Sequence, residues 1–229
     1  MAPMKSKYQP LPQRDETFLD TETTSLDPVV NEIVEFAAVK RDHKGKVIAT
    51  LHLKIRALYV NEPPPWAQYL PGFDLKAWEE NINYALKVNG LTREEVTSED
   101  RMHPDEAAKR IYDFINNTTV IGQNPAFDMA MIDALVKRAG LTQKDRDGNT
   151  VPARLPYHKI DTVGLAYEHL RPLGLKLLSL SKEGGICEFL GIEITNAHTA
   201  MGDVLMTIKV YDTLNRMSWL QRAWKRLTK

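Results

Sequence analysis

Three short segments, far apart in the chain, carry acidic side chains of the kind that bind divalent metal ions. They are Phe-Leu-Asp-Thr-Glu-Thr-Thr at 18–24, Asn-Pro-Ala-Phe-Asp at 124–128 and His-Thr-Ala-Met-Gly-Asp at 198–203. Two like charges about 4 Å apart repel by roughly 4 kcal/mol at an effective dielectric near 20, so clustered carboxylates stay ionised only beside cations. If the fold gathers Asp20, Glu22, Asp128 and Asp203, their hard oxygen atoms suit Mg²⁺ or Mn²⁺.

Such a set of residues could hydrolyse phosphodiester bonds. Two metal ions roughly 3.5 to 4 Å apart activate an attacking water and stabilise the leaving oxygen during in-line displacement. His198 precedes Asp203 in the third segment, and an imidazole suits the removal of a proton from that water near neutral pH. The five residues together predict a nuclease active site.

Each segment alone has an ordinary explanation. Asp20 and Glu22 could end a solvated strand, and Asn124 and Asp128 could be turn and first-turn helix residues favoured by the helix dipole. His198 and its acidic neighbour could be a surface pair. The prediction therefore depends on finding all three segments in this order, at strand and helix ends that one edge of a sheet would bring together.

In sequence, the three segments resemble the Exo I, II and III motifs of the DEDD 3′-to-5′ exonucleases. The last has the form His-x-x-x-x-Asp rather than Tyr-x-x-x-Asp, and so resembles the histidine (DEDDh) branch, which includes proofreading subunits of replicative DNA polymerases, RNase T and oligoribonuclease. The resemblance covers about residues 17–215. It implies that Asp20, Glu22, Asp128 and Asp203 hold two Mg²⁺ or Mn²⁺ and that His198 is the general base.

The resemblance also implies residues that contact the substrate. The backbone near Thr21 and Thr23 would meet the terminal 3′-hydroxyl, and Leu26 would pack on the last base; simple loop packing is the alternative. Asn124 would orient a ligand carboxylate or the backbone. One departure is Ser25, which stands where many relatives have glycine.

The apolar pattern predicts an α/β domain. A mixed five-stranded sheet flanked by helices, the RNase H-like fold, would combine an antiparallel meander with later parallel strands. The strands expected are 17–21, 33–41, 46–56, 118–122 and 155–160. Two helices are expected at 127–139 and 201–214, and two more are expected to begin after Pro104 and after Asp161. Asp20 and Glu22, two apart on one strand, would share a face. Asp161 is expected to cap a helix rather than to bind metal.

Composition bounds the molecule without naming a substrate. Thirty basic and thirty acidic residues cancel in a chain of 229 residues, so attraction for nucleic acid must be local. With the single Cys187 and no long apolar stretch, we expect a cytoplasmic protein without a membrane anchor. Residues 1–16 are expected to form a flexible arm, 17–215 the exonuclease domain and 216–229 a basic amphipathic helix.

Two regions have less specific patterns. Residues 57–103 are rich in proline and aromatic side chains, including Trp66, Trp78 and Tyr84, which either cover the sheet edge or stack on bases. The tail 216–229 interleaves basic and apolar residues, a pattern that fits packing on the domain, phosphate contact or docking to a polymerase.

The resemblance to the DEDDh family implies a 3′-to-5′ exonuclease that acts on single-stranded or frayed DNA, releases 5′-mononucleotides and serves proofreading or repair, with a DNA polymerase or replication protein as partner. RNA trimming is the enzymatic alternative, because no residue shows how the site treats a 2′-hydroxyl. A catalytically inactive nucleic-acid- or polymerase-binding subunit is the alternative of another class.

Overall fold

The computed structural model describes residues 14–227, and their side chains as far as Met217. The strands are β1 (Glu16–Thr23), β2 (Ile33–Arg41), β3 (Val47–Lys54), β4 (Thr119–Gly122), β5 (Thr142–Lys144), β6 (Thr150–Pro152) and β7 (Lys159–Asp161). The helices are α1 (Leu75–Asn89), α2 (Arg93–Thr97), α3 (Pro104–Ile115), α4 (Pro125–Arg138), α5 (Thr162–Leu170), α6 (Ile186–Phe189) and α7 (Ala200–Leu227), with 3₁₀ turns η1 (Ala67–Tyr69) and η2 (Arg171–Leu173).

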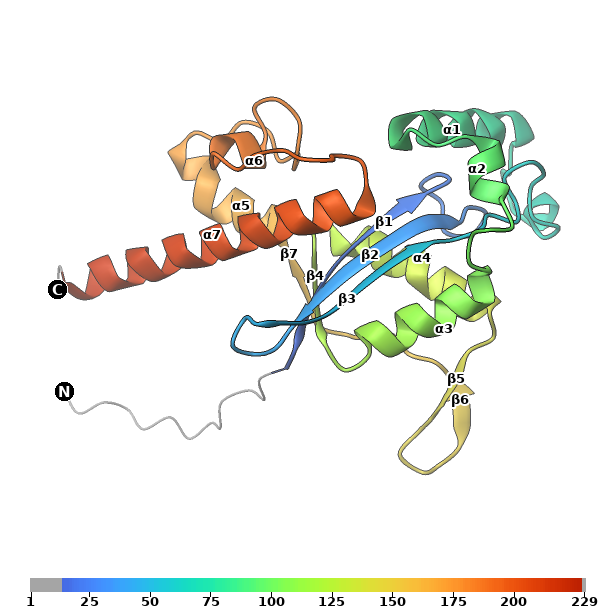
Figure 1. Cartoon of the computed structure of the whole chain (residues 1–229), viewed down its shortest axis with the longest axis horizontal. Helices are drawn as coiled ribbons and strands as arrows, with labels where there is room; N and C mark the ends of the chain where they lie inside the picture. Colours follow the sequence, from blue (N-terminus) through green and yellow to red (C-terminus); the bar gives the residue numbers. More distant parts are fainter. Residues whose placement is uncertain (1–13, 228–229) are drawn as a thin grey trace.

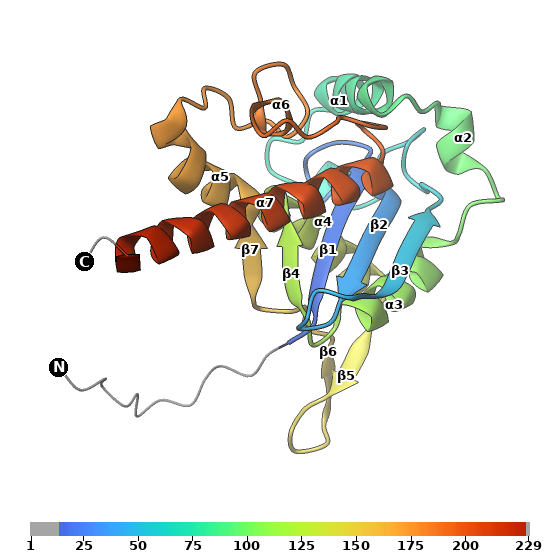
Figure 2. The ribbon, with the colours of Figure 1, turned by 60° about the vertical axis from the view of Figure 1, so that its left-hand side comes forward.

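Five strands form one mixed sheet in the order β3-β2-β1-β4-β7. β1, β2 and β3 pair antiparallel as a meander, whereas β4 runs parallel to β1 and β7 parallel to β4. Figure 2 shows α7 crossing one face of this sheet, with α3 and α4 behind the other. The predicted mixed five-stranded sheet flanked by helices is confirmed.

The alternation of side chains along β1 divides the core into two layers. Leu19 faces a cluster built with α3 and α4, while Phe18 faces a second cluster that includes Val204 and Ile208 of α7. Because β1 is paired on both sides and covered on both faces, it is the central strand. A residue placed at its end is therefore held firmly.

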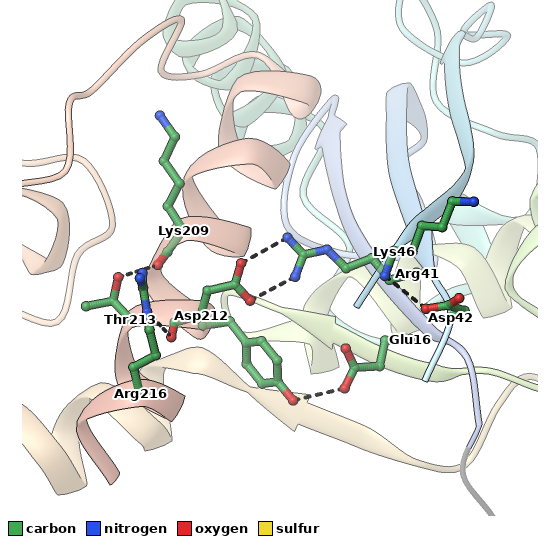
Figure 3. Close-up of polar contacts among 9 residues, drawn as sticks. Glu16, Arg41, Asp42, Lys46, Lys209, Asp212, Thr213 and Arg216 are labelled. Atoms are coloured by element: carbon green, nitrogen blue, oxygen red, sulfur yellow. Dashed lines mark hydrogen bonds and ion pairs between the residues drawn. The ribbon is translucent and has the colours of Figure 1, made fainter. Parts of the chain in front are cut away.

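Polar contacts attach α7 to this sheet (Figure 3). Both terminal nitrogens of Arg41 on β2 donate to the carboxylate of Asp212, at 2.8 and 3.0 Å. The hydroxyl of Tyr211 donates to Glu16 Oε1 of β1 at 3.1 Å. These contacts fix the position of the helix that carries Asp203.

Several expected boundaries were wrong. Of the strand expected at 155–160, only Lys159 and Ile160 pair in the sheet, and the pairing continues to Asp161. Pro156 lies before this strand, and proline has no amide proton for a ladder. β1 begins at Glu16, inside the arm expected at 1–16, and residues 1–13 lie outside the described part. The expected tail helix is continuous with the helix expected at 201–214, since α7 runs unbroken to Leu227.

The antiparallel hairpin β5–β6 was not predicted. It projects away from the sheet in Figures 1 and 2, and its turn is closed by the carboxylate of Asp145, which accepts from the backbone of Asp147 and Asn149. Asp147 and Gly148 provided a sequence signal for this turn. The helices α1 and α2 within residues 57–103 were also not predicted.

Candidate active site

Two strand residues and one helix residue converge at the end of β1. Asp20, Glu22 and Asp203 each place a carboxylate oxygen within 4.8 Å of the others. Asp20 and Glu22 leave the same face of β1, as their spacing predicted, and that is the face that α7 covers. The first turn of α7 then brings Asp203 over the two strand carboxylates.

Asp128 joins this group from the opposite layer. It lies in the first turn of α4 and is buried, and its Oδ1 accepts a hydrogen bond from the hydroxyl of Thr21 at 2.7 Å. Its charge raises the pKa of both Asp20 and Glu22, so the four carboxylates act on one another. The structure therefore brings three of the predicted acidic residues within 4.8 Å of one another and places the fourth, Asp128, close enough to affect them by its charge.

The third segment depends on a close approach of the loop before α7. A Cβ on Gly202 would lie 2.1 Å from the carbonyl oxygen of Asn196, so only glycine fits there. This packing lets the hydroxyl of Thr199 accept from the Gly202 amide at 3.2 Å and cap the helix. Thr199 and Gly202, between His198 and Asp203, are thus explained by the turn that joins these two residues.

His198 lies at the rim of the site. Its backbone is left-handed, with φ of 63°, and its side chain is exposed. Its backbone N–H donates to Asp203, and its side-chain charge favours the ionised form of that carboxylate. An exposed imidazole beside the carboxylates has access to water, as a general base requires.

The acidic cluster is electrostatically unfavourable without a cation. Burial raises the pKa of Glu22 to about 8, and the charges of Asp203, Glu35 and Asp128 add to this. Burial likewise raises the pKa of Asp20 and, to about 7, that of Asp128, despite the hydrogen bond from Thr21. A positive ion that enters the cluster therefore stabilises the ionised form of these carboxylates.

One atom supports the fit to a metal directly. Oδ1 of Asp203 is buried and has no hydrogen-bond partner among the residues that the structure describes. A buried carboxylate oxygen without a donor costs about 1 to 3 kcal/mol, and a cation would remove that cost. The all-oxygen donor set suits hard divalent ions, so the residues present fit a divalent metal centre.

The predicted substrate-contacting residues lie beside the carboxylates. A cavity of about 360 Å³ is lined by Thr21, Glu22, Thr23, Leu26, Tyr84 and Asn89. Leu26 is 77% exposed, and it also lines a second cavity of about 320 Å³. An exposed leucine between two cavities is available for contact with an apolar ligand surface.

Asn124 has a different position from that of the other three. It adopts a left-handed backbone, with φ of 60°, makes no side-chain cap, and does not line this cavity. The backbone N–H of Asn124 donates to Oδ1 of Asp161. The same oxygen accepts from the backbone N–H of Val163 and so caps α5. The expectation that Asp161 is a helix cap is confirmed, and this carboxylate also anchors the second motif.

Helix α1 supplies two further residues beside the carboxylates. The side-chain amide of Asn89 donates to the Thr23 carbonyl at 3.2 Å, and Tyr84, 72% exposed, lines the same cavity. In contrast, Trp78 is buried in the core and Trp66 donates to the Val29 carbonyl. These two tryptophans thus pack within the domain, whereas the exposed ring of Tyr84 is available to stack on a base.

The chain is similar to known exonucleases and polymerases in sequence and to exonuclease I in fold. Residues 17–74 match the RNase T family model, described as "Exonuclease". The chain is 26% identical over 193 residues to a PolC-type DNA polymerase III of Thermotoga petrophila and 27% identical over 195 residues to that of Bacillus cereus. Each alignment covers 84% of this chain but 11% of the relative.

Solved structures of exonuclease I share the fold. The Escherichia coli enzyme in complex with a dT13 oligonucleotide gives a TM-score of 0.63 at 21% identity, over 94% of this chain and 44% of that one. Exonuclease I from Methylocaldum szegediense gives 0.59 at 21% identity, over 86% and 39%. The fold is thus RNase H-like.

In its fold, in the family-model match over residues 17–74 and in its PolC-type relatives, the chain is similar to the DEDDh exonucleases. The chain spans about a tenth of the length of the curated relatives that it matches. Within residues 14–227, none of the helices combines the length and the apolar character needed to cross a membrane.

Proposed function

We propose that the chain is a 3′-to-5′ exonuclease that hydrolyses the terminal phosphodiester bond of a polynucleotide and releases 5′-mononucleotides. The observation that carries this proposal is the convergence of Asp20, Glu22 and Asp203 within 4.8 Å, next to Asp128 on its Thr21 hydrogen bond. Residues 17–215 would be the exonuclease domain, because they contain the complete set.

Two Mg²⁺ or Mn²⁺ are the proposed cofactors. When bound, such ions stabilise the charge that develops on the attacking and leaving oxygens. Asp20, Glu22, Asp128 and Asp203 would hold them, and the unpaired Oδ1 of Asp203 supports this assignment. Thr21 keeps Asp128 in place, and His198 would accept the proton of the attacking water at its exposed imidazole.

Single-stranded or frayed DNA is the preferred substrate. The cavity beside Glu22 is open enough for a nucleotide, with Leu26 and Tyr84 available to contact a base. Stacking on an aromatic side chain contributes about 1 to 3 kcal/mol per base. Escherichia coli exonuclease I, which shares this fold, was solved in complex with the oligonucleotide dT13. The PolC relatives support a replication context, with a polymerase or replication protein as partner.

Cys187, a buried free thiol, agrees with a cytoplasmic protein.

The test is hydrolysis of 5′-labelled DNA and RNA oligomers, single- and double-stranded, with Mg²⁺, Mn²⁺ or chelator. We expect a ladder of products shortened one nucleotide at a time from the 3′ end of single-stranded DNA, only with metal present. Asp20→Asn should abolish the ladder while circular dichroism and the melting curve show a folded protein. Faster degradation of RNA would favour the trimming alternative. Substantial turnover by Asp20→Asn would remove the metal-ligand assignment, and no turnover by the wild type would favour the binding subunit.

A further inference from the structure

A fifth carboxylate lies next to the metal-binding cluster, and no sequence motif includes it. Glu35 on β2 is directly opposite Glu22 on β1 in the antiparallel register, which places the two side chains on the same face of the sheet. Side chains opposite each other in such a pair have Cβ atoms about 5 Å apart, and like charges there are destabilising. The charge of Glu35 also raises the pKa of Asp20, Glu22 and Asp203.

The Glu35 side chain is held in this unfavourable place by a histidine. Oε1 of Glu35 lies 2.6 Å from Nε2 of His52 on β3. The Glu35 side chain is only 13% exposed, whereas that of His52 is 41% exposed. The short contact with His52 on β3 therefore holds a largely buried Glu35 side chain in the position across from Glu22.

Two positively charged residues near Glu35 offset part of its charge. Its neighbours in register include Lys54 on β3, and Arg101, whose guanidinium donates to the Val34 carbonyl at 2.8 Å, also feels its charge. Lys54 belongs to the edge strand β3, on the opposite side of β2 from Glu22, and Arg101 belongs to the loop between α2 and α3. On the β1 side, Glu35 stands across from Glu22, and its charge opposes the ionisation of Asp20, Glu22 and Asp203.

We propose that Glu35 is a supporting carboxylate of the metal centre and that His52 positions it. This inference rests on the proposed function, because it assumes that the cluster of Asp20, Glu22 and Asp203 binds divalent ions. Glu35 lies outside the group of three whose oxygens converge, so it acts through its charge and through its neighbour Glu22. Its presence makes the empty site less stable and the occupied site more stable, and thus strengthens the attraction for the cation.

The experiment measures Mn²⁺ binding without nucleic acid, by calorimetric titration, together with the melting temperature in chelator. Glu35→Gln keeps the shape of the side chain and removes its charge. We expect it to weaken Mn²⁺ binding about 5- to 10-fold, as for loss of one nearby charge screened almost as in water, and to raise the melting temperature of the metal-free protein. A residue with a purely structural role would lower that temperature instead.

Two control variants sharpen this measurement. Glu99→Gln removes a carboxylate of a side chain that is 94% exposed and pairs weakly with Arg56, and it should leave Mn²⁺ affinity unchanged. His52→Ala should weaken Mn²⁺ binding about 2- to 4-fold because Glu35 is released, and His52→Gln, which retains a donor, should restore most of that loss.

The outcomes separate this inference from the function on which it rests. If Asp20→Asn removes Mn²⁺ binding but Glu35→Gln binds Mn²⁺ as tightly as the wild type, only the role of Glu35 is wrong. If Asp20→Asn binds Mn²⁺ normally, the metal site itself is misassigned. A Glu35→Gln variant that loses both stability in chelator and metal affinity would make Glu35 a structural residue.

Discussion

His198 is the residue whose proposed role depends most on its chemistry and least on packing. It is exposed, precedes α7, and contacts Asp203 through its backbone amide. We therefore expect His198→Ala to lower the hydrolysis rate by roughly 10² to 10⁴, the usual contribution of a general base. Mn²⁺ affinity, measured by calorimetry, should remain nearly unchanged. A variant with a wild-type rate would exclude His198 from the mechanism.

The pKa values of the carboxylates predict how the stability of the metal-free protein depends on pH. Burial raises the pKa of Glu22 to about 8 and that of Asp128 to about 7, whereas both groups titrate near 4 when unfolded. Between these values the native state binds more protons than the unfolded state, so stability falls as the pH rises. Urea unfolding in chelator should show higher stability at pH 5 than at pH 8.

Divalent metal should reverse this pH trend, because the ionised carboxylates then have a counter-charge. With saturating Mn²⁺, stability at pH 8 should exceed that in chelator by a larger margin than at pH 5. Asp20→Asn, which removes one of the crowded charges, should flatten the curve in chelator. A metal-free protein whose stability increases steadily from pH 5 to pH 8 would contradict the crowding of these residues.

At the scale of elements, the position of α7 determines whether the site exists. Asp203 reaches β1 because α7 is held against the sheet, by the apolar packing of Val204 and Ile208. The pair of Arg41 with Asp212 and the contact of Tyr211 with Glu16 add polar attachments. Arg41 is largely buried and Asp212 is more exposed, so the bidentate pair lies between a surface and a buried ion pair in strength.

A double-mutant cycle tests this attachment. Arg41→Met and Asp212→Asn, alone and together, should show a coupling of about 1 kcal/mol in unfolding free energy. Arg41→Met should also weaken Mn²⁺ binding a few-fold, since Asp203 moves with the helix. A coupling near zero, with unchanged Mn²⁺ binding, would mean that apolar packing alone positions α7.

The elements that sequence could predict are those with strong local signals. The apolar run at 33–41 coincides with β2, and Asp161 caps α5 as its place in the sequence suggested. The hairpin β5–β6 and the short helix α2, which has a Thr92–Glu95 capping box, had usable signals that were not recognised. Glu35 could not be found, because its nearness to Glu22 follows from strand register, and a bulge follows at Glu22 and Thr23. Long-range register has no local signature.

At the scale of the whole molecule, charge balance determines how nucleic acid is attracted. The formal net charge is zero, and the proposed site is a cluster of carboxylates that repels phosphate. Divalent ions would invert this local field. The chain is thus expected to bind single-stranded DNA mainly when its metal site is filled, with few contacts that depend on the remaining surface.

Fluorescence anisotropy with a labelled oligothymidine, in Ca²⁺ to limit turnover or in chelator, tests this expectation. Binding should be at least about ten-fold tighter in Ca²⁺, and Asp20→Asn should remove most of that difference. Because few phosphates are contacted, affinity should fall only gently between 50 and 200 mM salt, unlike the roughly 10³- to 10⁵-fold loss of a protein with 6 to 10 phosphate contacts. Tight and steeply salt-dependent binding in chelator would contradict a metal-centred mode. If truncation after Met217 then abolished this metal-independent binding, the basic side chains within residues 218–229 would be responsible for it. Phosphate contact is one of the roles that the sequence of this segment predicts.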